Sequence, residues 1–327
     1  MKIIDKIQSA GLAGCGGAGF PTAQKWLAVL KAKSAHPERP VYVVCNATEG
    51  EPAVSKDKYL IEYHPDEVAN GIRIAMETVG ADKAVFYCQK KDLKKYKVRL
   101  APHIKKMKME FFGEDGGYLC GEETTLLETV EGKTSEPRLR PPYPVEAGLN
   151  GCPTIINNVE TFYHVSKISK GEYRQTRFVT IAGEARNPGV FEVPLIAKIK
   201  HILKITKNAP HFGFFLQVGG GAAGTILLPD ELNQPLKGAG SVVIYNRQKT
   251  KPKELMTRWI NFFFKSNCGK CAPCREGLYR LREELKKTKP DWLQMRAVLE
   301  TMRDVSFCPL GKSVHEPMMN LMEKIGV

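Results

Sequence analysis

The sequence predicts an α/β fold built on a parallel sheet, followed by a smaller β-rich part and a helical C-terminal part. Two short apolar runs, at 41–47 and 83–89, flank a helical pattern at 65–81. Hairpin and strand patterns then follow, and from about residue 250 apolar residues recur at helical spacing. We therefore expect three domains in the 327 residues, with the bounds 1–170, 171–248 and 249–327.

The first domain is predicted from a strand, a helix and a second strand. The runs "VYVVCNA" (41–47) and "KAVFYCQ" (83–89) are rich in β-branched and aromatic residues, which is typical of buried strands. Between them, "PDEVANGIRIAMETVGA" (65–81) has apolar residues at helical spacing and reaches a glycine stop at Gly80. Such a βαβ unit places its two strands parallel in one sheet.

The second domain is predicted to be β-rich with one helix. The stretch "FVTIAGEARNPGVFEV" (178–193) is typical of a hairpin that turns at Asn187-Pro188-Gly189. The stretches "ILLPDEL" (226–232) and "GAGSVVIYN" (238–246) add two more strands.

Composition and charge exclude several classes of protein. With 43% hydrophobic and 26% charged residues, the chain is an ordinary globular protein. The net charge of +14 is concentrated in "KKDLKKYKVRLAPHIKKMK" (90–108), which is a solvated helix face or a basic docking surface for an acidic partner. No groove-reading motif accompanies it, so we expect no nucleic-acid partner. No apolar run reaches about 18 residues and no signal peptide is evident, so we expect a cytoplasmic protein that meets a membrane only through partners.

Four of the nine cysteines form a metal-ligand pattern. Cys268, Cys271 and Cys274 follow the spacing C-x2-C-x2-C, and Cys308 lies 34 residues further on. A tight loop can offer three thiolates to one face of a [4Fe–4S] cluster, and a distant cysteine can complete the set. The odd total and the missing export signal argue against a disulfide framework. The other five cysteines are scattered: Cys15, Cys45, Cys88, Cys120 and Cys152.

Structural zinc is the alternative for this pattern, although zinc sites commonly use paired C-x2-C knuckles. The helix predicted after the triplet has an apolar stripe of Leu278, Leu281 and Leu285. We interpret this stripe as core, with no part in binding the metal.

A glycine-rich stretch near the N-terminus indicates an anion site. The sequence "GLAGCGGAGFPTAQKW" (11–26) has five glycines within nine residues and then Lys25. Exposed backbone N–H groups ahead of a helix can cradle a phosphate, but glycine clusters also form plain tight turns. Two more stretches strengthen the first reading: "NATEGEPAVSKD" (46–57), just past a predicted strand, and "GGYLCGEETTLLETVEGK" (116–133). The Glu122-Glu123 pair in the latter is also explained as a helix cap.

Together these stretches resemble the flavin-bearing, NADH-oxidising subunit of respiratory complex I and its relatives in NAD-linked hydrogenases and formate dehydrogenases. The likeness continues through "EPRLRPPYP", "GCPTIINNVETF" and the cysteine motif, and so covers nearly the whole chain in order. The residues in register are Gly14, Gly16, Gly17, Ala18, Gly19, Phe20, Pro21, Thr22, Lys25 and Trp26; Asn46, Glu49, Gly50, Glu51, Pro52, Lys56 and Asp57; and Gly117, Tyr118, Cys120, Gly121, Glu122, Glu123 and Thr124.

The resemblance implies a Rossmann-like FMN-binding domain, a β-grasp domain and a helical bundle that holds one [4Fe–4S] cluster. It implies that FMN contacts the 14–19 loop, Lys25, Asn46, Gly121, Asn157 and Asn158. It places the dinucleotide beside Phe20, Glu49, Glu51, Glu123, Arg140 and Tyr143, and it adds Thr48, Tyr118 and Glu122 to the cofactor-binding set.

The implied chemistry explains why these cofactors occur together. NADH gives up two electrons as a hydride, whereas a cluster accepts one at a time, and a flavin converts between the two. The hydride passes directly to the flavin, so we expect no catalytic acid or base. The chain begins at the glycine loop and stops shortly after Cys308. The resemblance therefore implies partner iron–sulfur subunits, namely a thioredoxin-like [2Fe–2S] subunit and a hydrogenase, formate dehydrogenase or similar module.

Departures from the family pattern keep two further functions open. Lost positive charge in the glycine loop and a lost carboxylate after the first strand favour an electron-relay subunit that carries flavin and cluster but does not use NAD(H). A scaffold that retains only the cluster is the third hypothesis. The departures are Ala13 and Cys15 for two arginines, Ala23 for a glycine, Thr48 for an aspartate, Arg140 for a lysine and Tyr143 for a phenylalanine.

Overall fold

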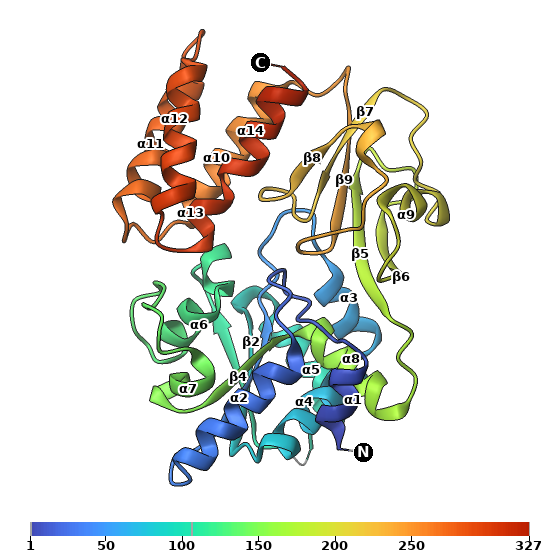
Figure 1. Cartoon of the computed structure of the whole chain (residues 1–327), viewed down its shortest axis with the longest axis vertical. Coiled ribbons are helices and arrows are strands. Elements are labelled where there is room, and N and C mark those ends of the chain that lie inside the picture. Colours follow the sequence, from blue (N-terminus) through green and yellow to red (C-terminus); the bar gives the residue numbers. More distant parts are fainter. Residues whose placement is uncertain (1, 106, 327) are drawn as a thin grey trace. The chain divides into compact units, whose positions relative to one another are not determined.

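The computed structural model describes residues 2–105 and 107–326. It forms two compact units (Figure 1). The first comprises Met1–Gly50 and Ser55–Phe178, and the second comprises Glu51–Val54 and Val179–Val327. The short segment Glu51–Val54 therefore leaves the first unit and groups with the second.

A four-stranded parallel sheet, in the order β3-β2-β1-β4, is the centre of the first unit. Val43 and Val44 of β1 lie opposite Ala84 and Val85 of β2, which confirms the predicted parallel pair. The sheet confirms the α/β class expected for this part of the chain. The strands are β1 (Tyr42–Ala47), β2 (Lys83–Gln89), β3 (Met109–Glu114) and β4 (Thr154–Asn158).

Helices connect these strands and cover the sheet. The predicted helix at 65–81 is α4, and Gly80 ends it in the left-handed conformation with φ +60°. The predicted strands and this helix are confirmed, whereas α3 just before α4 was not predicted. The helices are α1 (Ile3–Ser9), α2 (Thr22–Ala35), α3 (Lys56–Tyr63), α4 (Pro65–Val79), α5 (Lys90–Leu100), α6 (Glu123–Val130), α7 (Pro144–Ala147) and α8 (Val159–Lys170), with 3₁₀ turns at Ala101–His103, Tyr118–Gly121 and Leu149–Gly151.

Both faces of this sheet are covered, as a parallel sheet requires. On one face, Val44, Tyr87 and Ile156 pack with Leu126 and Leu127 of α6 in one buried cluster. Helices α4 and α8 contact each other and β1. Gly71 makes that close approach possible, because a Cβ there would lie 1.9 Å from the carbonyl oxygen of Phe162. The strand ends, and the residues that follow them, are thereby fixed on a rigid frame.

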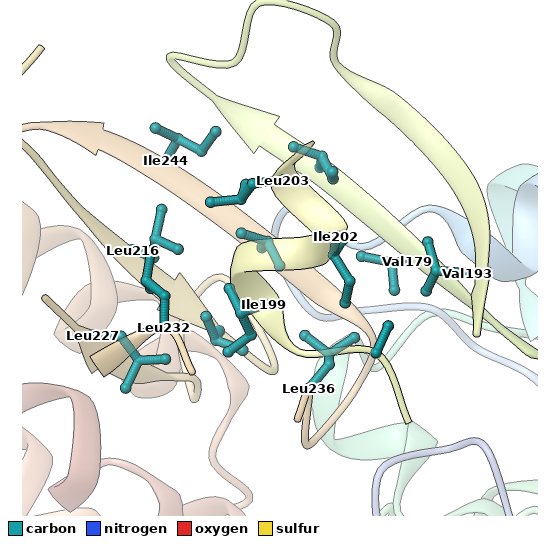
Figure 2. Packing of buried hydrophobic residues seen from close by; sticks show 14 residues of the cluster. Val179, Val193, Ile199, Ile202, Leu203, Leu216, Leu227, Leu232, Leu236 and Ile244 are labelled. Atoms are coloured by element: carbon teal, nitrogen blue, oxygen red, sulfur yellow. The ribbon is translucent and has the colours of Figure 1, made fainter. Parts of the chain in front are cut away.

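The second unit contains a mixed five-stranded sheet in the order β6-β5-β9-β7-β8. Strands β5 and β9 are parallel, while β7 is antiparallel to both β8 and β9. One helix, α9 (Ile199–Ile205), packs on it, and Ile199, Ile202 and Leu203 lie among Val179, Leu216 and Ile244 in Figure 2. The strands are β5 (Thr176–Gly183), β6 (Gly189–Pro194), β7 (Phe214–Val218), β8 (Thr225–Leu227) and β9 (Ser241–Asn246).

Two strand predictions in this sheet are confirmed and one is partly wrong. The predicted hairpin at 178–193 corresponds to the neighbouring strands β5 and β6, and the stretch 238–246 contains β9. The third predicted strand, 226–232, is confirmed only for Ile226 and Leu227, which belong to β8. The rest of the stretch includes a 3₁₀ turn at Pro229–Glu231. The strand ends there because Pro229 has no N–H to donate and its fixed φ favours the first turn of a helix.

The chain is helical from Pro252 onward, as predicted. Leu278, Leu281 and Leu285 are buried, which confirms that they belong to the core. The last helix is fixed to the sheet, because Asn320 Oδ1 accepts a hydrogen bond from Thr225 Oγ1 at 2.7 Å. The helices are α10 (Pro252–Ser266), α11 (Ala272–Lys286), α12 (Trp292–Val305), α13 (Pro309–Ser313) and α14 (His315–Lys324).

Across residues 2–105 and 107–326, no helix combines the length and the apolar character that crossing a membrane would require.

Candidate cofactor site and metal centre

The order of the parallel sheet predicts where a ligand binds. The chain builds β1, β2 and β3 outward in one direction and then returns to the opposite side of β1 with β4. Ligands of open α/β sheets bind at the carboxyl ends of the strands, where the strand order reverses. At that point, between β1 and β4, Cys45 lies opposite Asn157 and Asn46 lies opposite Asn158. The structure therefore brings the predicted residues 46–50, 157 and 158 to this switch point.

The glycine loop between α1 and α2 lies against the same strand end. Its base is closed by hydrogen bonds from Gly14 N to Phe20 O and from Thr22 N to Leu12 O, both 2.9 Å. Gly17 and Gly19 have φ +112° and +66°, which side chains other than glycine rarely adopt. A Cβ on Gly16 would lie 3.4 Å from the Cβ of Asn158. The loop thus combines an exposed, glycine-dependent backbone with a fixed position beside β4.

The second and third predicted stretches meet where β1 ends. Asn46 Nδ2 donates to Gly121 O at 2.9 Å, and Asn46 Oδ1 accepts from Thr48 N at 3.1 Å. Gly50 lies so close to Tyr118 that a Cβ would be 3.0 Å from the Tyr118 Cα. The hydroxyl of Thr48 is buried and has no hydrogen-bond partner among the described residues. A buried orphan hydroxyl is costly, so a bound polar group would stabilise this corner.

Two cations at the site are already paired with carboxylates. Lys25 Nζ lies 2.6 Å from Glu123 Oε1 and also donates to Ile156 O at 2.9 Å. Arg140 contacts Glu122 and lies 3.8 Å from Glu123 Oε2. The positive charge that an anion would meet here is therefore largely balanced.

Glu122 caps helix α6, as the alternative interpretation of the Glu122-Glu123 pair anticipated. Its Oε2 accepts from Thr124 N at 3.0 Å and from Thr125 N at 2.8 Å.

Two side chains that are predicted to contact the dinucleotide are open to solvent, since Phe20 is 52% and Tyr143 is 51% exposed. They are free to pack against a ligand, whereas Glu122 has its carboxylate engaged by the chain itself.

A buried ionic network underlies the switch point. Lys56 Nζ lies 2.8 Å from Asp57 Oδ1, 3.0 Å from Glu160 Oε2 and 3.1 Å from Asn158 Oδ1. Asn158 caps α8 through Glu160 N and donates to Asp57. Burial opposes the ionisation of Glu160, but the charge of Lys56, the neighbouring His164 and the hydrogen bond from Phe178 N hold its pKa down to about 2. These groups therefore form a charged network that is held together inside the protein.

The predicted contacts Asn157 and Asn158 are thus occupied within the protein. Oriented to satisfy its neighbours, the Asn157 amide donates to Ile156 O at 2.9 Å and accepts from Trp26 Nε1 at 3.1 Å. Sequence reasoning missed Lys56 and Glu160 as a buried pair. The signal was present, because both lie in motif stretches that were already singled out, but a lysine in sequence is usually an exposed residue.

Glu49 and Glu51 have different surroundings. Glu49 accepts hydrogen bonds from Asp57 N (2.9 Å) and Lys58 N (3.3 Å) at the start of α3. Burial, and then the negative charge of Asp57, raise the pKa of Glu49 to about 7. Glu51 belongs to the second unit, where its Oε1 accepts from Ala222 N at 2.8 Å and from Ala223 N at 2.9 Å. The carboxylates of these two predicted residues are therefore held by different segments of the chain.

Glu49→Gln is expected to reduce the pH dependence of stability. Because the native pKa of about 7 lies above the ordinary value of 4.5, the native state keeps a proton that the unfolded state releases in this interval. The stability contributed by this carboxyl therefore falls as the pH rises from 4.5 to about 7. Thermal melts at about pH 5 and pH 7.5 should show a larger loss for the wild type than for the variant. Equal losses would contradict this assignment.

The four late cysteines converge at the N-termini of two helices in the second unit. Cys271 precedes the first residue of α11 and Cys308 precedes the first residue of α13. Cys274 and Cys308 are buried, at 6% and 8% exposure. Burial, and then the charges of Cys271, Cys308 and Cys268, raise the pKa of Cys274 to about 12. Four thiols that repel one another as thiolates are a suitable donor set for a cationic centre.

Gly311 allows the Cys308 loop to approach the triplet. A Cβ at this position would lie 2.5 Å from Ser306 Oγ and 3.1 Å from the Cys274 Cβ. We expect Gly311→Ala to displace Cys308 and to lower the iron retained per chain by at least half. The matched control is Gly213→Ala, because a Cβ at Gly213 meets nothing within 4 Å. Iron content after reconstitution measures the effect, and equal iron in both variants would contradict it.

Comparison with known proteins gives consistent matches. The Nuo51 FMN-binding domain model matches residues 7–167, and the NADH-ubiquinone oxidoreductase-F iron-sulfur binding region matches residues 254–325. The F subunit of NADH-quinone oxidoreductase from Mycobacterium tuberculosis is 31% identical, over 97% of this chain and 81% of that protein. The HndC subunit of the NADP-reducing hydrogenase of Solidesulfovibrio fructosivorans is 29% identical, over 98% and 74% respectively.

A solved structure, the NAD+-reducing [NiFe]-hydrogenase in the H2-reduced state, superimposes with a TM-score of 0.90 at 29% identity. The match covers 99% of this chain but 62% of that hydrogenase chain, which is less than two thirds of its length.

Proposed function

The chain belongs to the family of NADH-quinone oxidoreductase F subunits, and from this premise we propose that it is an electron-input subunit. It passes electrons between NAD(H) and iron–sulfur carriers through FMN and one [4Fe–4S] cluster, as part of a multi-subunit complex. One observation carries the proposal. The FMN-domain match covers the parallel sheet with its glycine-lined switch point, and the iron–sulfur match covers the four converging cysteines.

We propose three domains with the bounds expected from the sequence. Residues 1–170 are a Rossmann-like FMN-binding domain, supported by a parallel sheet whose order reverses beside β1. Residues 171–248 are a β-grasp domain, supported by the mixed sheet and its single α-helix, α9, among the described residues. Residues 249–327 are the helical domain that holds the cluster.

The residues at the switch point fit a flavin nucleotide. The glycine loop offers backbone N–H groups to a phosphate, and the orphan hydroxyl of Thr48 would gain a partner. Bound FMN supplies the conversion between hydride and single-electron transfer. The residues that we propose for FMN are Gly14, Gly16, Gly17, Ala18, Gly19, Lys25, Asn46, Thr48, Tyr118, Gly121, Glu122, Asn157 and Asn158, of which Glu122, Asn157 and Asn158 act by shaping the site.

The exposed rings of Phe20 and Tyr143 are proposed to pack against the dinucleotide. Glu49, Glu123 and Arg140 set the charge around it. Glu51, held by the amides of Ala222 and Ala223, fixes the path of the chain after β1. None of these residues is proposed as a catalytic acid or base.

The cluster ligands are proposed to be Cys268, Cys271, Cys274 and Cys308. When bound, the cluster supplies a one-electron acceptor. The chain's part is to present four thiolates from the ends of α11 and α13 and to shield two of them from solvent.

Partner subunits are proposed to complete the electron path. Iron–sulfur proteins, such as a thioredoxin-like [2Fe–2S] subunit, and a hydrogenase, formate dehydrogenase or similar module fit this role. The names of the related proteins, which include a hydrogenase subunit, support it.

An electron-relay subunit that does not use NAD(H) is the second candidate. The observation in its favour is the balanced charge at the switch point: Lys25 is paired with Glu123, Arg140 with Glu122, and Ala13 and Cys15 carry no charge. A dinucleotide pyrophosphate would meet little net positive potential there.

An anaerobic titration with NADH distinguishes these functions. With the chain reconstituted with FMN and iron–sulfur cluster, we expect stoichiometric NADH to bleach the flavin absorbance. A flavin that ignores NADH but is bleached by dithionite would overturn the input role and support the relay. A protein that carries a cluster but binds no FMN would overturn both and leave a scaffold.

A further inference from the structure

A second group of metal-ligating side chains lies in the first unit, apart from the late cysteines. One ligand atom each of Cys15, Glu160 and His164 lies within 4.8 Å of the other two. Cys15 comes from the glycine loop, and Glu160 and His164 lie one turn apart on α8. The backbone N–H of Cys15 donates to Thr161 Oγ1 at 3.0 Å, which fixes the loop against this helix. The three side chains therefore come from two elements that are held together.

His164 is buried beside Glu160. It is 1% exposed, and neither ring nitrogen has a hydrogen-bond partner among the described residues. Glu160 Oε1 lies 3.5 Å from Nε2. Tyr163 and Tyr173 lie edge-on to the ring, each with its centroid at 5.2 Å. A buried imidazole whose polar contact is one long approach to a carboxylate is poorly satisfied, and a bound metal ion would stabilise it.

We propose that Cys15, Glu160 and His164 bind one divalent transition-metal ion, for which zinc is the best match. Sulfur, nitrogen and oxygen donors together are the ligand types that zinc accepts, and three protein ligands leave a fourth position for water. Bond lengths of about 2.0–2.3 Å need only a small closure of the three atoms. On binding, the thiol of Cys15 releases its proton to solvent and the sulfur forms the bond to the metal.

The charges around the group are compatible with a cation. Lys56 lies 3.0 Å from Glu160 Oε2, but Asp57 at 2.8 Å balances it. Glu160 Oε1 accepts from Phe178 N at 2.7 Å and keeps a second lone pair for a metal. Burial, and then the charge of Glu160, raise the pKa of Cys15, whereas Lys56 and Arg177 lower it, so the thiol is protonated until a metal ion replaces its proton. A bound ion would thus clamp the glycine loop to α8, and this inference does not depend on the proposed electron transfer.

The test uses the full chain with its late cysteines occupied by the reconstituted cluster. We expect the wild type to bind one equivalent of zinc beyond its iron, measured by elemental analysis. Anaerobic cobalt should give a thiolate-to-cobalt charge-transfer band. Cys15→Ala and His164→Gln should each weaken cobalt binding by at least about 100-fold, since each removes a direct ligand.

The control variants are Cys152→Ala, at a buried cysteine away from the group, and His36→Gln, at an exposed histidine. Both should bind cobalt as the wild type does. Cys15→Ser serves as a second variant with little change of volume, and melting temperatures identify any variant that fails to fold. Equal zinc in the wild type, Cys15→Ser and His164→Gln, or cobalt spectra without the sulfur band, would overturn the proposal.

Discussion

Cys274→Ser is expected to remove the iron–sulfur cluster while leaving flavin binding intact. Cys274 is the most buried of the four late cysteines, and burial together with the charges of Cys271, Cys308 and Cys268 raises its pKa to about 12. A serine there offers a harder oxygen donor that deprotonates far less readily, and iron–sulfur clusters require thiolates. Iron should fall from about four atoms per chain to less than one.

The readouts separate loss of the cluster from loss of the fold. Iron and acid-labile sulfide measure the cluster, and FMN retained after gel filtration measures the first unit. NADH should still bleach the flavin in Cys274→Ser, while reduction of a one-electron acceptor through the cluster should be lost. Cys152→Ser is the matched control, because Cys152 is buried in the other unit and should retain full iron. Unchanged iron in Cys274→Ser, or zinc in the wild type, would contradict the assignment.

The elements that sequence predicted well are those with a strong local pattern. Strands β1 and β2 are continuous apolar runs, and α4 has a glycine stop at Gly80, so neighbouring residues alone specify them. The cysteine spacing is equally local, and the structure brings all four thiols together. The edge of the sheet that carries the site followed from the βαβ pattern, because parallel strands place their carboxyl ends at one edge. The switch point itself depends on β4, which was not predicted as a strand.

What sequence could not supply depends on partners far along the chain. Nothing in the sequence around Lys56 shows that it is buried, because its partner Glu160 lies about a hundred residues further along the chain. Glu51 belongs to the same motif as Glu49, yet amides of Ala222 and Ala223 fix its carboxylate. Helix α3 was missed because it is short and its start is capped by Glu49 from the preceding loop. Motif membership therefore identified the region correctly and left the role of each side chain open.

The Lys56 network gives the largest expected effect on stability. Lys56→Met removes the ammonium and leaves Asp57 and Glu160 buried without their cation, at 4% and 1% exposure. Removing one partner of a buried ion pair typically costs about 3–5 kcal/mol. For a unit of this size, that loss corresponds to a fall in Tm of roughly 6–20 °C. Differential scanning calorimetry should show this fall in the Tm of the transition in which the first unit unfolds.

The comparison variant is Lys91→Met, since Lys91 is exposed on α5 and its loss should change stability by less than about 0.5 kcal/mol. The double variant Lys56→Met/Glu160→Gln should lose less than the sum of the two single variants, because neutralising Glu160 relieves one of the two stranded carboxylates. A strictly additive double variant would mean that these two groups are not coupled. A Tm for Lys56→Met within about 1 °C of the wild type would mean that water reaches the network and already solvates the carboxylates.

The same network also supports the glycine loop, because Lys56 donates to Asn158 and Gly16 of the loop approaches the Asn158 side chain. We therefore expect Lys56→Met to weaken FMN retention as well, whereas Lys91→Met should retain FMN as the wild type does.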